Sequence, residues 1–157
     1  MSDHQRLANL EELLKLLYEK LGYFERQLII AHDPSTKFDL EQRIKREILP
    51  RLRSYEAEYW ELCPTIVISD EQAEMQLVQV EQAVQSIERI PPVEYPPELF
   101  FLLQEIRTKL ADLDKAASAK LKVVLPLIPV IASYELEMDT EGLMYKAWKS
   151  IKRLVRR

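Results

Sequence analysis

The sequence contains very little glycine and cysteine, and each scarcity excludes a class of protein. Its only glycines are Gly22 and Gly142. Phosphate-binding loops and tight β-hairpin turns depend on the backbone freedom of glycine, so the sequence disfavours both, together with most all-β folds. The single cysteine, Cys63, excludes an intramolecular disulfide and is compatible with a reducing compartment.

The residues that usually carry catalysis or bind metals are also scarce. The two histidines, His4 and His32, lie near the beginning of the chain and beside a predicted turn, and neither belongs to a Glu-x-x-His pair. Pro64 follows Cys63 directly and no histidine is near it in sequence, so a buried or bystander thiol is the simpler interpretation than a nucleophile. We therefore expect no metal, no cofactor and no enzymatic activity.

The composition is that of a globular chain of ordinary domain size. Hydrophobic residues make up 47% of the 157 residues and charged residues 31%. The net charge of −4 argues against nucleic-acid binding. The first residues are polar where a signal peptide would be apolar, so we expect a cytoplasmic protein.

The first part of the chain, residues 1–63, predicts a long antiparallel helical hairpin. Two apolar stripes with spacings of three and four carry this prediction: Leu7, Leu10, Leu14, Leu17, Leu21, Phe24 and Leu28, then Leu40, Ile44, Ile48, Leu52, Tyr55, Tyr59 and Leu62. Asp33 and Pro34 favour a short connection, which makes the helices antiparallel neighbours. Pro50 interrupts the second stripe and predicts a kink near residues 46–49.

The second part, residues 64–157, predicts a smaller helical lobe with a two-stranded β element, in one structural unit with the hairpin. Helical stripes cover residues 70–88 and 97–113. Residues 65–68 are β-branched, and residues 131–138 alternate between apolar and acidic side chains, so we expect these two segments to pair as strands. An apolar run, residues 121–134, leads into the second of these segments. It is shorter than a membrane span and holds two prolines. The predicted fold class is mostly α.

The last segment predicts a basic amphipathic helix that Thr140 caps. Its basic residues are candidates for an interaction surface: Lys146, Lys149, Lys152, Arg153 and Arg156. Three interpretations stay open for this helix: docking on the acidic body of the same molecule, binding an acidic partner, and contact with an anionic membrane. Trp60 and Trp148 are the candidate apolar anchors of an interface, provided that they are exposed.

Two blocks of the chain, residues 10–63 and 119–155, carry a family resemblance. The first resembles a helical module common in cyanobacterial multidomain proteins, and the second resembles the segment that often accompanies it; their unusual strings are "KFDLEQRIKREILP" and "LPLIPVIASYELEMDTEG". That module stands N-terminal to signalling NTPases of the STAND or NACHT kind and to caspase-like effectors, and is described as an effector-associated, death-like adaptor that works through like-with-like contacts. The resemblance marks residues of mainly structural importance: Phe38, Pro50, Tyr55, Tyr59, Pro126, Pro129, Tyr134, Asp139 and Gly142.

The resemblance implies a non-enzymatic adaptor that recruits or oligomerises effector proteins in bacterial signalling or conflict systems. Its partner would be an effector with a similar module or a second copy of the chain. The alternative from another class is a peripheral membrane or lipid-binding helical protein that uses the basic terminal helix.

Overall fold

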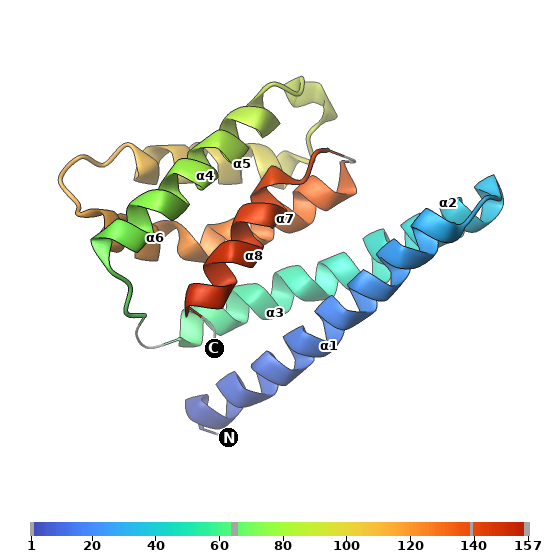
Figure 1. Cartoon of the computed structure of the whole chain (residues 1–157), viewed down its shortest axis with the longest axis horizontal. Helices are drawn as coiled ribbons and strands as arrows, with labels where there is room; N and C mark the ends of the chain where they lie inside the picture. The colour runs from blue at the N-terminus through green and yellow to red at the C-terminus, as the bar shows by residue number, and fades with distance from the viewer. Residues whose placement is uncertain (1, 64–65, 139, 156–157) are drawn as a thin grey trace. The chain divides into compact units, whose positions relative to one another are not determined.

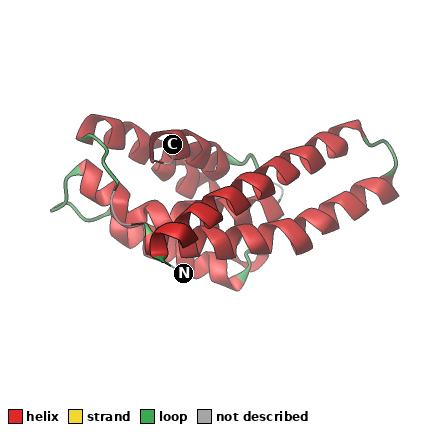
Figure 2. Ribbon diagram, turned by 90° about the horizontal axis from the view of Figure 1, so that it is seen from below, coloured by secondary structure: helices red, strands yellow, loops and turns green. Residues whose placement is uncertain are grey.

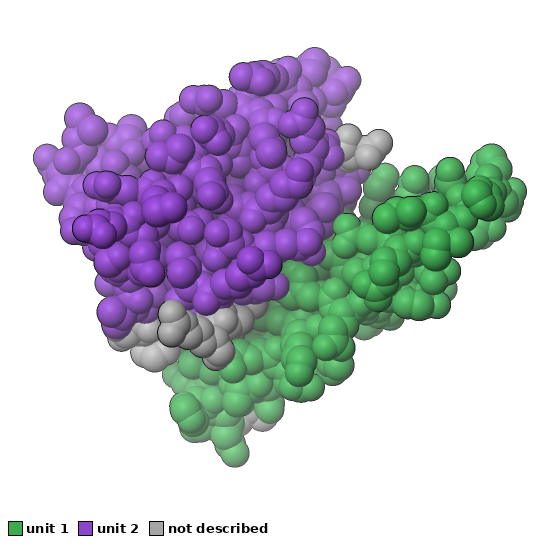
Figure 3. All heavy atoms as spheres, viewed as in Figure 1, with its two compact units in different colours: residues 1–63 green, residues 64–157 purple. Residues whose placement is uncertain are grey.

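A computed structural model describes residues 2–63, 66–138 and 140–155. The chain divides into two compact units, Met1–Cys63 and Pro64–Arg157, which match the two predicted segments and are coloured separately in Figure 3. Helices dominate both units, and Figure 2 shows helices and loops but no strand among the described residues. The mostly α fold class is confirmed, and the β element is not.

Unit 1 is the predicted helical hairpin (Figure 1). Helix α1, Asp3–Ile30, begins at Ser2, whose hydroxyl accepts a hydrogen bond from the Gln5 N–H. Helix α2, Pro34–Arg43, begins at Asp33, whose carboxylate accepts one from the Thr36 N–H. Both are the side-chain caps that the sequence favours, because the first N–H groups of a helix have no partner within it. The predicted apolar stripe of α1 forms its buried face.

Pro50 changes the winding of the second arm without ending it. A π-helical segment, Ile44–Ile48, joins α2 to helix α3, Leu49–Leu62. The Leu49 N–H donates to the Ile44 carbonyl, five residues earlier. A proline has no N–H and its ring collides with the carbonyl four residues back, so the wider turn accommodates Pro50 inside a continuous helical arm. The predicted irregularity is therefore a π turn.

Polar contacts fix the alignment of α1 against α3. Three pairs connect the two helices: Arg6 with Glu58, Glu11 with Tyr59, and Tyr18 with Glu56. The Tyr18 hydroxyl donates to the Glu56 carboxylate over 2.6 Å, and Glu56 is only 1% exposed. A buried carboxylate that needs a particular donor favours one alignment of two helices over the alternatives.

Unit 2 is a set of packed helices connected by short turns (Figure 1). Its elements are α4 (Asp70–Glu88), the 3-10 turn η2 (Pro92–Glu94), α5 (Pro97–Leu110), α6 (Ala117–Val124), the 3-10 turn η3 (Leu125–Leu127), α7 (Ile128–Glu137) and α8 (Leu143–Val155). Helix α4 packs along α8 and α6, and α7 packs along α8. Helix α4 ends at Glu88, and Pro91 and Pro92, which cannot continue a helix, follow shortly after it.

The predicted strand at residues 131–138 is wrong, because these residues belong to helix α7 and the turn after it. The buried residues Ile128, Ile131 and Glu135 fall at helical spacing. Pro126 lies in the 3-10 turn and Pro129 in the first turn of α7, positions where a missing N–H costs no helical hydrogen bond.

The proposed mate of that strand also lacks strand structure. Residues 66–68 are irregular, and Thr65 lies outside the described residues. Val67 is 88% exposed and Ile68 is buried, so this segment leads into α4 with one anchored side chain. No β ladder therefore joins residues 66–68 to residues 131–138 in the structure.

Candidate functional site

The inner face of α8 anchors this helix within unit 2. Met144, Ala147, Trp148 and Ile151 are buried along one face, at the spacing that the sequence predicts. Trp148 is fully buried and therefore belongs to the core of the unit. It does not meet the condition of exposure under which we expected it to be an interaction anchor.

Trp60 does not meet that condition either. It is 7% exposed, and its ring meets the Tyr59 ring edge-on with 4.8 Å between the centroids. Neither tryptophan offers a free aromatic surface to a partner in this structure.

The outer face of α8 carries the exposed positive charge. Lys146, Lys149 and Arg153 are exposed, and Lys152 is half-buried. The Lys149 ammonium lies 4.5 Å from the centroid of the Tyr145 ring, a cation–π contact that holds this side chain along the helix. Arg156, the last of the predicted basic candidates, lies outside the described residues. The helix thus docks on its own unit through apolar side chains and leaves most of its positive charge at the surface.

A buried carboxylate from α7 caps the beginning of α8. The Met144 N–H donates to Glu135 Oε2 over 2.9 Å, and the Tyr145 N–H donates to Glu135 Oε1 over 3.0 Å. Glu135 is 1% exposed. Burial raises the pKa of the Glu135 carboxyl, while the two N–H donors and the charge of Lys146 act in the opposite direction. Glu135 therefore fixes the start of α8 against α7.

Thr140 has a different role from the predicted one. Its hydroxyl accepts a hydrogen bond from the Gly142 N–H over 3.2 Å and so shapes the turn before α8 instead of capping the helix. Gly142 has φ +71°, the left-handed conformation that glycine adopts without strain. The turn and the Glu135 carboxylate together set the direction of the basic helix.

Helix α4 presents an acidic outer surface beside α8. Glu74, Glu81 and Glu88 repeat every seven residues and therefore follow one line along the helix. Val78, one turn from both Glu74 and Glu81, is 54% exposed, and Met75, farther round the outer surface of the helix, is 67% exposed. The sequence analysis did not single out this surface, although the spacing of seven and the lack of Lys or Arg between Asp70 and Glu88 could have shown it.

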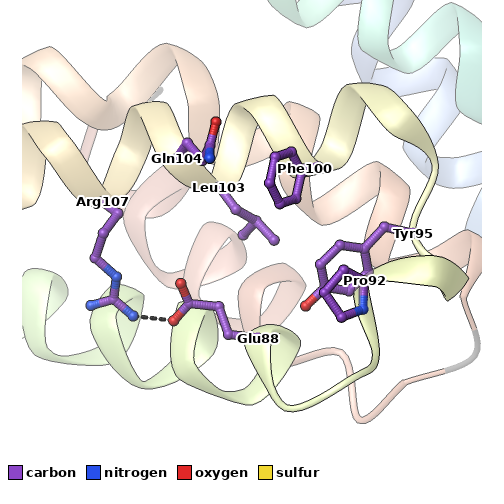
Figure 4. Close-up of a pocket in the computed structure, with 7 residues that line it drawn as sticks. All are labelled: Glu88, Pro92, Tyr95, Phe100, Leu103, Gln104 and Arg107. Atoms are coloured by element: carbon purple, nitrogen blue, oxygen red, sulfur yellow. Dashed lines mark hydrogen bonds and ion pairs between the residues drawn. The ribbon is translucent and has the colours of Figure 1, made fainter.

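A shallow cavity of about 290 Å³ lies between the end of α4, the turn η2 and α5 (Figure 4). Its lining consists of Glu88, Pro92, Tyr95, Phe100, Leu103, Gln104 and Arg107. Glu88 pairs with Arg107 at one end, and at the other Tyr95 donates a hydrogen bond to the Ile87 carbonyl. Burial raises the pKa of the Tyr95 hydroxyl. The polar groups at both ends are engaged with each other or with the backbone, so the cavity offers an apolar surface and no activated nucleophile.

The residues marked by the family resemblance are divided between core and surface. Tyr59 and Pro129 are buried; Tyr55, Pro126, Tyr134 and Gly142 are half-buried; Phe38 and Pro50 are exposed. Phe38, on α2, is 59% exposed, and Asp139 lies outside the described residues. The structure does not bring these residues together into one site.

Metal ligands and membrane-spanning length are two further features of the described ranges that bear on function. No group of three or more His, Cys, Asp or Glu residues there has the arrangement of a metal site. The helical run Ala117–Glu137, 21 residues, is long and apolar enough to cross a membrane by length and composition alone, and core helices meet the same criterion. The run is longer than the sequence suggested, because α6, η3 and α7 follow one another directly. Leu125 and Ile131 within it are buried and Leu127 is half-buried.

The surface of α8, with Lys146, Lys149 and Arg153, is therefore the strongest candidate interaction site, and α4 adds an acidic surface next to it. Comparison with known proteins adds no identity to this geometry. No protein-family model, no curated protein and no solved structure matches the chain.

Proposed function

We propose that this protein is a cytoplasmic, non-enzymatic adaptor that recruits or oligomerises effector proteins of bacterial signalling or conflict systems. The outer face of α8 binds an acidic surface of a protein partner. The resemblance of two sequence strings to effector-associated adaptor modules supports this function, and the geometry of α8 carries it.

One observation supports the choice of α8: its apolar face is already buried, while its basic face is exposed. Met144, Trp148 and Ile151 hold the helix in unit 2, and Glu135 fixes its first turn. Three exposed positive charges therefore stand at fixed positions on a packed helix. Such charges bring an acidic partner in rapidly and exclude basic partners, since complementary potentials govern encounter and specificity.

The same observation weighs against the membrane alternative. A helix that lies in the membrane interface inserts its apolar face among the lipids. In α8 that face contains Trp148, which is fully buried in unit 2. Membrane contact through α8 would then rest on surface charge alone, which attracts basic residues to anionic lipid but inserts nothing.

The experiment compares the tagged wild-type chain with the variant K146E/K149E/R153E. Proteins captured from native cells by the wild-type chain and lost with the variant are purified, and their direct binding to the chain is measured at several salt concentrations. We expect an effector whose binding to the wild-type chain weakens with salt and is abolished by the charge reversal, because ions screen contacts between exposed charges.

The matched control reverses three exposed basic residues of unit 1, K15E/K37E/R51E, which changes the net charge equally and leaves α8 intact. Equal loss of binding in both variants would show a general charge effect and contradict the proposal. Salt-sensitive flotation of the wild-type chain with anionic vesicles, without any protein partner, would favour the membrane alternative instead.

A further inference from the structure

We infer that the acidic partner of α8 is α4 of a second copy, so that two chains pair through their second units by a crossed α4–α8 contact. The inference rests on the proposed function, because it uses the same basic face of α8; a second copy and an effector therefore bind this face in competition. It adds the identity of the partner surface and the symmetry of the assembly.

The two helices form one continuous surface of unit 2. Helices α4 and α8 pack against each other. Figure 1 shows them side by side at the front of the unit, running in opposite directions, with α5 behind them. Their outer faces therefore point to the same side of the unit, one acidic and the other basic.

The charges of the two helices are spaced alike. Glu74 and Glu81 on α4 are seven residues apart, and so are Lys146 and Arg153 on α8. At about 1.5 Å per residue, each pair spans roughly 10 Å along its helix. No ion pair with a described residue engages any of these side chains. Two acidic and two basic side chains thus stand at matching intervals on neighbouring helices of one surface.

The C-terminal end of the glutamate line meets α5. Glu88 continues this line and pairs with Arg107 of α5. Met75 and Val78, exposed by 67% and 54%, are the apolar side chains of the same outer surface. An exposed apolar centre beside charged residues is the usual composition of a protein interface.

A two-fold axis that runs over the outer surface, parallel to the helices and above the line between α4 and α8, makes this surface complementary to itself. Rotation about it lays α4 of one chain over α8 of the other, and α8 over α4, so the contact occurs twice. Each contact sets acidic side chains against basic ones, and the apolar residues of the two copies of α4 lie near the axis. The symmetry closes at two chains, which predicts a dimer and not a filament.

A second copy satisfies more of the surface than an unrelated acidic protein would. An acidic partner would cover α8 but would leave Glu74 and Glu81 facing like charges if it extended over α4. The partner must therefore be basic where α4 is acidic and acidic where α8 is basic, and this arrangement is what the chain itself presents.

The experiment is analytical ultracentrifugation of the full chain and of two reversal variants, one for each helix. On α4 the variant is E71K/E74K/E81K, which includes Glu71, a further exposed glutamate one turn before Glu74; on α8 it is K146E/K149E/R153E. We expect wild type to approach twice the monomer mass of 18.5 kDa with increasing concentration and to dissociate at high salt. Each variant alone should stay monomeric, because its two contacts set like charges together. An equal mixture should dimerise again, because both contacts between the two different chains are complementary.

Restoration in the mixture also shows that the variants are folded, and helical circular dichroism confirms it for each. A monomeric wild-type chain at its highest soluble concentration overturns the inference, and so does a mixture that stays monomeric although both variants are folded. The inference can fail alone: a monomer whose effector binding still depends on the charges of α8 retains the proposed function. Conversely, a dimer that binds no effector retains this inference and refutes that function.

Discussion

Replacement of Glu135 by Gln tests how α8 is held, because it removes the charge and changes little else. The glutamine amide has one acceptor oxygen and one NH2 donor, whereas the carboxylate accepts from both the Met144 and Tyr145 N–H groups. One buried N–H therefore loses its acceptor and faces another donor. Hydrogen bonds to charged groups contribute about 1.5–3 kcal/mol each, so we expect the first turn of α8 to lose about 1–2 kcal/mol of local stability at the N–H without an acceptor. Loss of the charge also relieves the burial penalty that raises the pKa of Glu135, so the free energy of global unfolding should change less than this local stability.

Hydrogen exchange of individual amides measures the loss of stability at the N–H groups that Glu135 binds. A loss of about 1.4 kcal/mol corresponds to a tenfold faster exchange. In Glu135→Gln, we expect one of the two amides, Met144 or Tyr145, to exchange about tenfold faster, with a smaller change in α5. Glu137→Gln, a half-buried neighbour on the same helix, is the matched control. Unchanged exchange at both amides would refute the assignment of Glu135 as the cap of α8.

The pH dependence of stability tests the burial of the same carboxyl. The pKa of Glu135 is raised above the ordinary 4.5, so between 4.5 and its folded value the native chain holds a proton that the unfolded chain has lost. Stability from this group is fully present below about pH 4.5 and is lost as the pH rises through the folded pKa. The stability of wild type minus that of Glu135→Gln should therefore decrease with increasing pH across this window. Urea titrations at several pH values measure it, and a flat or rising difference would contradict the burial argument.

Three further predictions concern single residues, each measured by urea unfolding. Gly142→Ala should cost about 1–2 kcal/mol through the left-handed backbone alone, because an added Cβ would lie 3.9 Å from Glu135 Oε1, its nearest neighbour, which is an ordinary van der Waals distance. An unchanged free energy of unfolding would contradict the φ of +71°. Trp148→Ala should cost about 3–5 kcal/mol, and a loss below about 1 kcal/mol would show that Trp148 is not in the core. Tyr18→Phe should cost about 1–3 kcal/mol by removing a donor from buried Glu56, and a neutral result would dispute that contact.

Local signals in the sequence predict unit 1 well, because its determinants are close together in the chain. A stripe of leucines at spacings of three and four specifies the face of α1, and Ser2 and Asp33 cap the helices that follow them directly. Even the disturbance at Pro50 follows from a covalent property of that residue. The sequence does not reveal that a π turn accommodates Pro50, since an ordinary kink would also relieve the clash of the proline ring with the carbonyl four residues earlier.

Unit 2 shows where local signals fail, because carboxylates from other helices cap two of its helices. Ala116 and Gly142 stand at the N-terminal boundaries of α6 and α8 and have no capping side chain. Asp70 of α4 accepts from the Ser118 N–H over 2.9 Å, and hydrogen bonds from the Ser118 side chain and from this N–H lower the pKa of Asp70. Glu135 of α7 does the same for α8. Neither pair is adjacent in sequence, so no boundary motif announces it.

The wrong prediction of a strand at residues 131–138 also involves a carboxylate that binds the backbone of another helix. Counted as a surface residue, Glu135 completes an alternating pattern with Glu137; counted as a buried residue, it extends the helical series of Ile128 and Ile131. The two patterns place this carboxylate on opposite sides of the backbone, and in the structure two N–H groups nine and ten residues later bind it in the interior. The same contact orients the basic face of α8. A residue that misleads secondary-structure prediction is therefore the one that positions the proposed interaction surface, and its replacement should weaken partner binding as well as the local stability of the first turn of α8.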